Sequence, residues 1–344
     1  LCKLEKYNCS ISYKEFIKKE MIHFSKYDCE RSIPNIMDGM KTSQRKIIYS
    51  AFKRRLHTEI KVAQFAGYVS EHSSYHHGEQ SLNGAIVNMA QNYVGSNNIN
   101  VLEPKGQFGT RIQGGKDSAS ERYIFTKLNK ITRMIYKEED DVILDYINDD
   151  GTIVEPVHYA PIIPMILVNG SKGIGTGFST EIMCYDPLII IDYIQNVLKG
   201  KSIDSIDFIP YYQGYKGTID KITENKFIMK GMYKVDGNKV HITELPVGTW
   251  TDDYKEFIEK LMDGGKTNKP IVKDYNDMST DQNIDITIVF TNGSIKKLQE
   301  TKTEYENCNG LDKYLKMYTS KSTTNMHMFD ETEKLKKFNK INEI

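Results

Sequence analysis

The sequence predicts an α+β fold, in which a helical part is followed by a part made mainly of strands. Before residue 92, apolar residues recur at helical spacing in several short segments. After about Tyr212, apolar and polar residues alternate as they do in half-buried strands. The chain has 344 residues, of which 39% are apolar, and this is enough for the cores of two or three domains.

Four helices are predicted in the first part. One covers residues 13–24, a second begins at about Ser43, a third spans about Val62–Ser70, and a fourth begins at about Gly78. Ser43 is a good N-cap because its hydroxyl can accept a hydrogen bond from a free backbone N–H. Short helices with tight connections are typical of a helix-turn-helix, although short helices are also common in other folds.

Glycine-rich loops follow these helices. Gly, Asn and Pro become frequent in GSNNIN, LEPKGQFGTRIQGGKDSAS and VNGSKGIGTGFS, and such loops can bring the backbone close to other groups. Between the loops, a helical pattern begins at Ile124, and Ile162–Val168 is expected to be buried. Asp-Pro at positions 186–187 opens a clear helix that ends at Gly200. We place a domain boundary between residues 185 and 186.

The second part is predicted to be strands interrupted by one strong helix. The helix has acidic residues in its first turn and ends at Gly264. The residues at 338–344 follow a Lys- and Asn-rich pattern that predicts the beginning of another helix. The chain begins with Leu rather than Met, which suggests a piece of a longer protein. The predicted strands are Gly217–Ile222, Phe227–Met229, Lys239–Leu245 and Asp285–Phe290.

Charge is distributed unevenly along a chain that is neutral as a whole, with 46 basic and 46 acidic residues. Residues 26–133 contain 16 basic and 9 acidic residues, an excess of 7 positive charges, whereas residues 138–155 contain eight acidic residues and no Lys or Arg. We expect a phosphate backbone to lie on the first stretch and to avoid the second. The alternative is that both stretches are ordinary solvated faces.

Composition argues against several other classes of protein. The five cysteines form no CxxC pair, so neither a zinc site nor a disulfide framework is indicated, and a reducing intracellular compartment fits. The longest apolar run, Ile162–Val168, is broken by Pro164 and is far too short to span a bilayer, and no signal peptide is present. The sequence also contains neither a GxxxxGK[ST] loop for ATP nor a DxDxDG cluster for a divalent metal.

A candidate for chemistry is the pair Arg122 and Tyr123, directly after the glycine-rich loop. A tyrosine hydroxyl can attack phosphorus and hold a covalent phosphotyrosyl ester. A neighbouring guanidinium can stabilise the charge that builds on the phosphate oxygens. The pair alone is not specific, because the chain has 22 tyrosines and most tyrosines serve in packing.

Longer motifs supply the context for this pair. The strings ERSIPNIMDGMKTSQRKIIYSAFKR, VAQFAGYVSEHSSYHHGEQSL, AQNYVGSNN, PKGQFGTR, SASERYIFTKL and PIIPMILVNGSKGIGTGFS resemble the eukaryotic-type (type IIA) DNA topoisomerase II family. The later strings GYKGTIDKI, VHITELPVGTWTDDYKEF and NMHMFD resemble the tower domain of that family. The resemblance implies a CAP-like winged-helix DNA-binding domain at 1–185, a mixed α/β tower at 186–337, and the start of a coiled coil at 338–344.

The resemblance also implies roles for individual residues. Tyr123 would be the nucleophile, Arg122 and Arg31 catalytic arginines, and His77 a catalytic histidine. Ile174 in GIGTGFS would intercalate between base pairs and bend the DNA, although the residue alone would be read as a loop anchor. The side chains that would contact the DNA backbone are Lys41, Arg45, His76, Gln107, Arg111 and Lys116. The family commonly has Lys-Pro-Gly-Gln-Arg where this chain has KTSQR, so the geometry of that turn is open.

The expected partners and cofactors follow from the same resemblance. Double-stranded DNA and a second copy of the chain are expected, since a double-strand break requires two tyrosines, and no membrane is expected. Mg²⁺ and ATP would be bound by TOPRIM and ATPase domains that this chain lacks. The location would be the nucleus of a eukaryotic cell, or the host cytoplasm or viral factory for a virus-encoded enzyme.

Two other functions remain open at the level of sequence. A non-catalytic DNA-bending module would keep the winged helix and the intercalating residue but would have no need of Tyr123. A prokaryotic gyrase-like protein is a weaker alternative, because that family lacks the tower strings found here.

Overall fold

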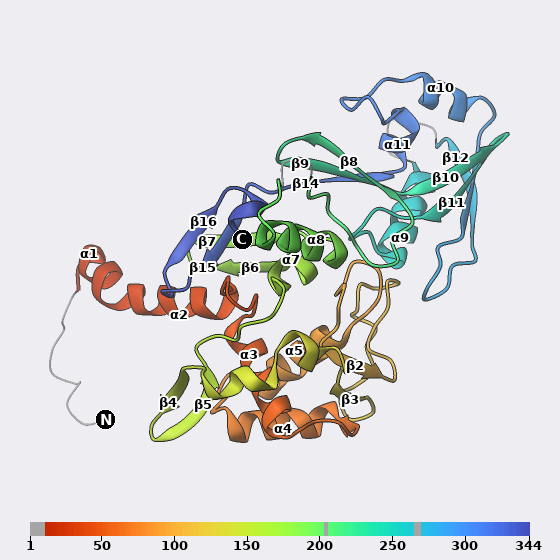
Figure 1. The fold of residues 1–344 in the computed structure, drawn as a ribbon. Coiled ribbons are helices and arrows are strands. Elements are labelled where there is room, and N and C mark those ends of the chain that lie inside the picture. The colour runs from red at the N-terminus through yellow and green to blue at the C-terminus, as the bar shows by residue number, and fades with distance from the viewer. Residues whose placement is uncertain (1–10, 203–205, 265–269) are drawn as a thin grey trace.

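The computed structural model describes residues 11–202, 206–264 and 270–344. Helices and antiparallel strand pairs occur in both halves, which confirms the predicted α+β class. The described residues form two hydrophobic cores, one built from residues between Met40 and Phe338 and a smaller one contained within residues 240–317. In Figure 1 the smaller core lies at the upper right, under α9 (Thr251–Asp263) and its sheet. Two of the five cysteines, Cys2 and Cys9, lie outside the described residues.

The helices predicted in the first part are confirmed. A long helical segment begins with α1 (Tyr13–Phe16), continues as the π-helical turn Ile17–Met21 and ends with α2 (Ile22–Ser32). In Figure 1 this segment extends away from the rest of the molecule. The next three helices are α3 (Thr42–Lys53), α4 (Val62–His72) and α5 (Glu79–Ala90), and their apolar faces fill the larger core.

The segment after Tyr123 is a strand, so the helical pattern predicted from Ile124 is wrong. Residues Phe125–Leu128 form β3, which lies between β1 (Ile60–Lys61) and β2 (Leu102–Lys105). Burial alternates along β3 in the two-residue period of a strand. Pairing with two strands from distant parts of the chain decides the conformation here, and a local pattern does not reveal such pairing. The short helix α6 (Thr132–Ile135) follows.

Two hairpins and two helices complete the first part. The hairpins are β4 (Tyr146–Asp149) with β5 (Thr152–Pro156), and β6 (Ser171–Gly175) with β7 (Phe178–Ile182). The buried run predicted at 162–168 includes α7 (Met165–Asn169). The helix predicted from the Asp-Pro pair is α8 (Pro187–Leu198), and Asp186 caps it by accepting a hydrogen bond from the Leu188 N–H at 2.8 Å.

The second part contains the predicted strands and the predicted helix α9. A four-stranded sheet has the order β10 (Met232–Asp236), β11 (Lys239–Glu244), β13 (Ile286–Phe290), β12 (Val272–Asp277). A second sheet has the order β14 (Tyr318–Ser322), β9 (Lys226–Lys230), β8 (Thr218–Thr223). Two short helices, α10 (Ser294–Glu300) and α11 (Gly310–Tyr314), precede β14.

The helix predicted at 338–344 is not present in the described residues. Leu335–Phe338 instead forms β16, which pairs with β15 (Met326–Phe329), and Ile341–Glu343 is a 3₁₀ turn. The division of the chain between residues 185 and 186 stays a prediction. Ile190 and Phe227, which follow that boundary, pack in the larger core.

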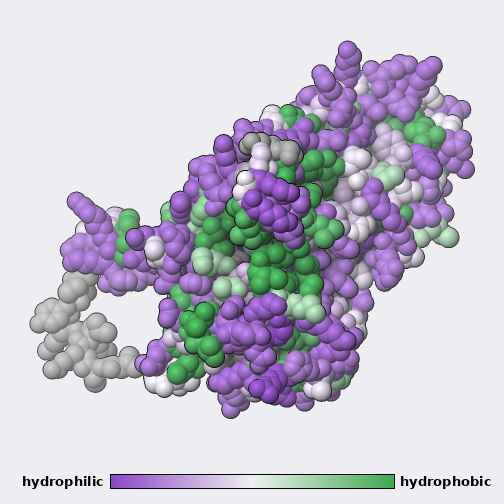
Figure 2. Space-filling model, in the orientation of Figure 1, coloured by the Kyte–Doolittle hydropathy of each residue, from purple (hydrophilic) through white to green (hydrophobic). Residues whose placement is uncertain are grey.

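An apolar groove of about 720 Å³ lies between α8, α6 and the segment before α7. Its lining includes the exposed side chains of Met134, Ile162 and Leu188. Figure 2 shows apolar side chains gathered in the middle of the face in view, whereas the upper right of that face is hydrophilic. Helix α8 therefore buries Ile190 in the core and leaves a second apolar side at the surface.

The β6–β7 hairpin packs closely on α2 because β6 has glycines at positions 173 and 175. A Cβ atom on Gly173 would overlap the carbonyl oxygen of Ser32, and one on Gly175 would lie 3.0 Å from the Cys29 sulfur. Successive residues of a strand point to opposite faces, so Ile174 between them points away from α2. The two glycines thus fix the position of the hairpin tip.

We predict that Gly173→Ala lowers the free energy of unfolding by about 1–3 kcal/mol, because the added methyl group forces β6 away from α2. Urea unfolding of the variant and the wild type measures the difference. Gly67→Ala in α4 is the control, since nothing lies within 4 Å of a Cβ at that position. It should be neutral or stabilising by up to about 1 kcal/mol, and equal stability of the two variants would contradict close packing at Gly173.

Candidate functional site

Tyr123 is held on a fixed backbone with its side chain in solvent. It lies in a turn closed by a hydrogen bond from its own N–H to the Ser120 carbonyl at 2.9 Å. On either side, the carbonyls of Glu121 and Ile124 accept hydrogen bonds from the first residues of α4, at 3.1 and 3.0 Å. Ile124 is buried, whereas 76% of Tyr123 is exposed. A packing role, which is the usual role of tyrosine, does not account for this exposure.

Arg122 is also exposed, beside Tyr123 on the same turn. Two adjacent residues with free polar ends can reach one external group together. A guanidinium offers five N–H donors in a planar fork that matches phosphate oxygens. The geometry therefore suits a hydroxyl nucleophile next to a phosphate-binding cation.

The two histidines predicted for the site lie in the connection between α4 and α5. His76 is exposed and His77 is half-buried. The Tyr27 hydroxyl, from α2, lies 3.1 Å from His77 Nδ1, is also in contact with His77 Nε2, and lies 3.5 Å from His76 Nε2. The Tyr75 ring packs edge-on against His77, with ring centroids 5.3 Å apart. His77 is thus oriented by two aromatic residues.

Tyr27 was missed by the sequence analysis. It lies 50 residues before His77, and only the packing of α2 brings the two side chains together. The sequence gives no local signal for such a contact. Tyr27 belongs to the candidate site because its hydroxyl is the hydrogen-bonding partner of the histidine pair.

Lys41 and Ile174 lie together at the junction of α2 and β6. The Lys41 Nζ donates a hydrogen bond to the Lys172 carbonyl at 2.7 Å, and burial lowers the pKa of Lys41. Ile174, two residues further along β6, is 75% exposed. Arg31 is exposed in the last turn of α2. Lys41 is also the N-cap of α3, and its N–H bonds the Gln44 side chain at 2.9 Å, so the KTSQR turn starts a regular helix.

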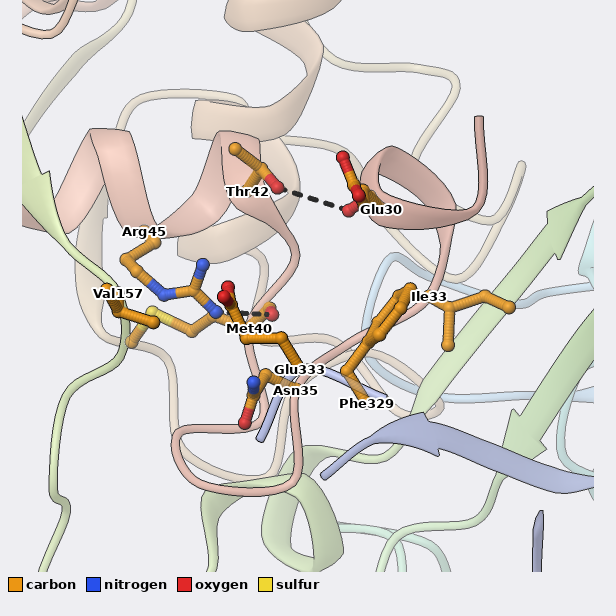
Figure 3. A pocket seen from close by; sticks show the side chains of 9 residues that line it. All are labelled: Glu30, Ile33, Asn35, Met40, Thr42, Arg45, Val157, Phe329 and Glu333. Atoms are coloured by element: carbon orange, nitrogen blue, oxygen red, sulfur yellow. Dashed lines mark hydrogen bonds between the residues drawn. The ribbon is translucent and has the colours of Figure 1, made fainter. Parts of the chain in front are cut away.

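Arg45 does not lie on the surface, although a DNA-backbone contact was predicted for it. It is 7% exposed and its Nε lies 2.7 Å from the Asp38 carboxylate. Figure 3 shows the pocket of about 250 Å³ beside it, in which the guanidinium points to the Met40 carbonyl and two acidic residues, Glu30 and Glu333, also line the walls. Burial lowers the pKa of Arg45, but the Asp38 carboxylate outweighs burial and raises it. This arginine serves the interior of the protein.

Arg111 is also buried, unlike Gln107 and Lys116 in the same glycine-rich loop. Arg111 is 5% exposed and forms an ion pair with Glu244, the last residue of β11. Gln107 and Lys116 are exposed and free to contact a ligand. Of the six predicted backbone contacts, Arg45 and Arg111 are therefore corrected: their charges are neutralised inside the protein and do not face solvent.

The acidic stretch at 138–155 is not one exposed block. Glu155 is buried and pairs with Lys46 at 2.8 Å, and Asp141 forms two hydrogen bonds with Arg133. Negative charge is exposed mainly at Glu138 and at the β4–β5 hairpin. Only part of this stretch can therefore repel a phosphate backbone.

The predicted site residues fall into two groups at opposite ends of α4. The loop and turn with Tyr123 bond to the first residues of α4, whereas His77 follows its last turn and connects through Tyr27 to α2. Eleven helical residues span roughly 16 Å at 1.5 Å per residue. One chain therefore does not close both groups around a single phosphate.

The described residues contain no group of three His, Cys, Asp or Glu side chains that could hold a metal ion. In the same residues, no helix is long and apolar enough to cross a bilayer. The three cysteines that the structure describes, Cys29, Cys184 and Cys308, are buried free thiols.

Comparison with known proteins adds to this geometry. Residues 31–344 match the family model of DNA gyrase/topoisomerase IV, in its A-type subunits. The chain belongs to this family. The match confirms the resemblance inferred from the sequence motifs, and it covers both groups of candidate residues.

Relatives of this topoisomerase chain include eukaryotic enzymes. It is 46% identical over 334 residues to DNA topoisomerase 2 of Arabidopsis thaliana, covering 95% of this chain and 22% of the relative. It is 44% identical over 336 residues to DNA topoisomerase 2-alpha of Rattus norvegicus, covering 97% and 21%. The chain thus spans about a fifth of the length of these relatives.

A solved structure shares the fold of this topoisomerase chain. The DNA-binding, cleavage and re-ligation domain of Plasmodium falciparum topoisomerase II superposes with a TM-score of 0.89 at 46% identity. The alignment covers 97% of this chain and 44% of that one. The order of helices and sheets described above is therefore that of a topoisomerase II cleavage region.

We predict that the stability of the wild type relative to Lys41→Met rises as the pH approaches 10.5, the ordinary lysine pKa. Burial lowers the folded-state pKa of Lys41, so the unfolded chain binds more protons in the window between that lowered value and 10.5. Urea unfolding at neutral pH and at about pH 10 measures the change. The exposed Lys130→Met is the control and should show no such rise; a rise of the same size in both would refute the burial of Lys41.

Proposed function

We propose that this chain is the breakage-and-rejoining region of a type II DNA topoisomerase, with Tyr123 as the nucleophile. The observation that carries the proposal is the exposure of Tyr123 beside Arg122 on an anchored turn, in a chain of this family. Tyrosine is otherwise most often a partly buried packing residue.

The chemistry is a transesterification in which no bond energy is lost. The Tyr123 hydroxyl oxygen attacks the phosphorus of a DNA phosphodiester and gives up its proton, while the bond from phosphorus to the 3′ oxygen breaks. The 3′ oxygen leaves and gains a proton, and a 5′-phosphotyrosyl ester remains. Attack by the 3′ hydroxyl reverses the reaction without another energy source.

Arg122 stabilises the negative charge that builds on the phosphate oxygens during this attack. Arg31, His76, His77 and Lys41 form the second group, at the other end of α4, and we assign it to the same phosphate in a dimer. A second copy of the chain would bring its own Tyr123 to this group. A homodimer also supplies the two nucleophiles that a double-strand break requires.

Ile174 is the residue that would bend the DNA. It is exposed on the tip of a two-stranded hairpin whose base is fixed by the glycine contacts with α2. An exposed apolar side chain on a rigid tip can enter between base pairs and partly unstack them, at a cost of a few kcal/mol that new contacts offset. Gln107 and Lys116 would contact the DNA backbone nearer to Tyr123.

The complete enzyme would pass one duplex through a transient break in another, which controls supercoiling and separates linked circles. Mg²⁺ and ATP would be bound outside this chain, since no described cluster of side chains fits a metal ion. We place the enzyme in the nucleus of a eukaryotic cell, or in the host cytoplasm or viral factory if a virus encodes it.

We predict that Tyr123→Phe in the full-length protein abolishes the covalent protein–DNA adduct and leaves the affinity for duplex DNA within about threefold, because a single hydroxyl contributes roughly 1 kcal/mol or less to binding. The adduct is measured by denaturing gel electrophoresis after the reaction is stopped with detergent.

Tyr13→Phe is the matched control, because Tyr13 is exposed on α1 and should leave the adduct unchanged. Persistence of the adduct in Tyr123→Phe would place the nucleophile elsewhere. A wild-type protein that bends DNA without any adduct would favour the non-catalytic DNA-bending module.

A further inference from the structure

The glycine-rich loop before Tyr123 is joined to the start of α9, on the smaller core. The N–H groups of Thr251 and Asp252, in the first turn of α9, donate hydrogen bonds to the carbonyls of Arg111 and Ile112 at 3.4 and 3.0 Å. The first N–H groups of a helix have no partner within the helix, so these loop carbonyls act as its cap. The Gln113 side chain adds a hydrogen bond to the Asp252 carboxylate at 2.9 Å.

The buried ion pair of Arg111 and Glu244 lies beneath this junction. Glu244 is 1% exposed, and its carboxylate also accepts hydrogen bonds from the N–H groups of Leu245 and Lys216, at 3.0 and 3.2 Å. These three partners of the carboxylate are all fixed in place by the fold. Removal of either charge would leave the other buried without compensation.

The indole ring of Trp250, the only tryptophan of the chain, covers the outer bend of the loop. A Cβ atom on Gly114 would overlap this ring, and one on Gly95 would lie 3.4 Å from it. The Tyr93 ring packs edge-on against the indole, with centroids 5.8 Å apart. The loop can approach the ring this closely only because position 114 is glycine, in a backbone conformation with φ of +62° that also favours glycine.

The loop is stiff between this junction and Tyr123. The Ala119 N–H bonds the Gln107 carbonyl at 2.9 Å, and Asp117 accepts hydrogen bonds from both the N–H and the hydroxyl of Thr110. The turn that carries Tyr123 begins at Ser120, directly after this closure. Movement of α9 and β11 would thus be transmitted to the nucleophile.

We infer that Arg111, Glu244 and the first turn of α9 form a latch that positions Tyr123, and that Arg111 is a positioning residue with no contact to DNA. The inference rests on the proposed function of Tyr123. It couples the position of the smaller core to cleavage: with the latch closed, Tyr123 is held for attack, and with the latch broken, DNA binds but the tyrosine is misplaced.

Single substitutions in the full-length protein separate a latch from a DNA contact. We expect Arg111→Gln and Glu244→Gln to reduce the covalent adduct at saturating DNA by tenfold or more, with the dissociation constant and its salt dependence unchanged. Removal of one phosphate contact would instead reduce the slope of log affinity against log salt by about 0.9. A loss of slope in Arg111→Gln but not in Glu244→Gln would overturn the latch.

Three further variants guard against loss of folding. Gln113→Ala removes only the peripheral hydrogen bond to Asp252 and should lower the adduct about threefold with thermal unfolding unchanged. Lys116→Gln, in the same loop, should reduce the salt slope. Asp312→Asn disturbs another buried pair of the second part, with Lys230, and should lower stability without reducing the adduct at saturating DNA.

The outcomes distinguish failure of the latch from failure of the proposed function. An unchanged adduct in folded Glu244→Gln and Gln113→Ala would overturn the latch, as would an equal loss in Asp312→Asn. An adduct that persists in Tyr123→Phe would overturn the proposed function itself.

Discussion

The anchoring of the backbone on both sides of Tyr123 is the constraint on which the rest of the structure depends. An exposed side chain has no packing of its own to fix it, so its position must come from the main chain. Here the buried Ile124, strand β3 between two partner strands, and the start of α4 fix one side. The glycine-rich loop and its junction with α9 fix the other. A nucleophile held this way loses little entropy when it reacts.

Burial of charge changes what the sequence composition suggests about DNA binding. The basic excess at residues 26–133 includes Arg45, Lys46, Arg111 and Arg133, and all four are paired with carboxylates. Three of those carboxylates lie outside the stretch that was counted, so the count overstated the positive surface. The basic side chains left in solvent include Arg31, Lys116 and Arg122, and these lie where the proposed chemistry needs them.

The sequence predicted elements whose cause is local and missed those whose cause is distant. The helix at 187–198 has its N-cap, its proline and its final glycine within a few residues, and it was predicted correctly. Strand β3 was not, because its conformation depends on β1 and β2. The contacts of Tyr27 with His77 and of Arg111 with Glu244 join residues 50 and 133 positions apart, so no local pattern shows them. The motifs around Tyr123 and Ile174 were found through family resemblance, and the structure adds their exposure.

The central claim is that Tyr123 is the residue that becomes linked to DNA. The most direct test is to trap the adduct of the full-length protein, digest both the protein and the DNA, and identify the nucleotide-bearing peptide by mass spectrometry. We expect a single modified tyrosine in the peptide that contains SERYIF, at Tyr123. A nucleotide on any of the other 21 of the 22 tyrosines in this chain, or on a residue outside it, would contradict the claim.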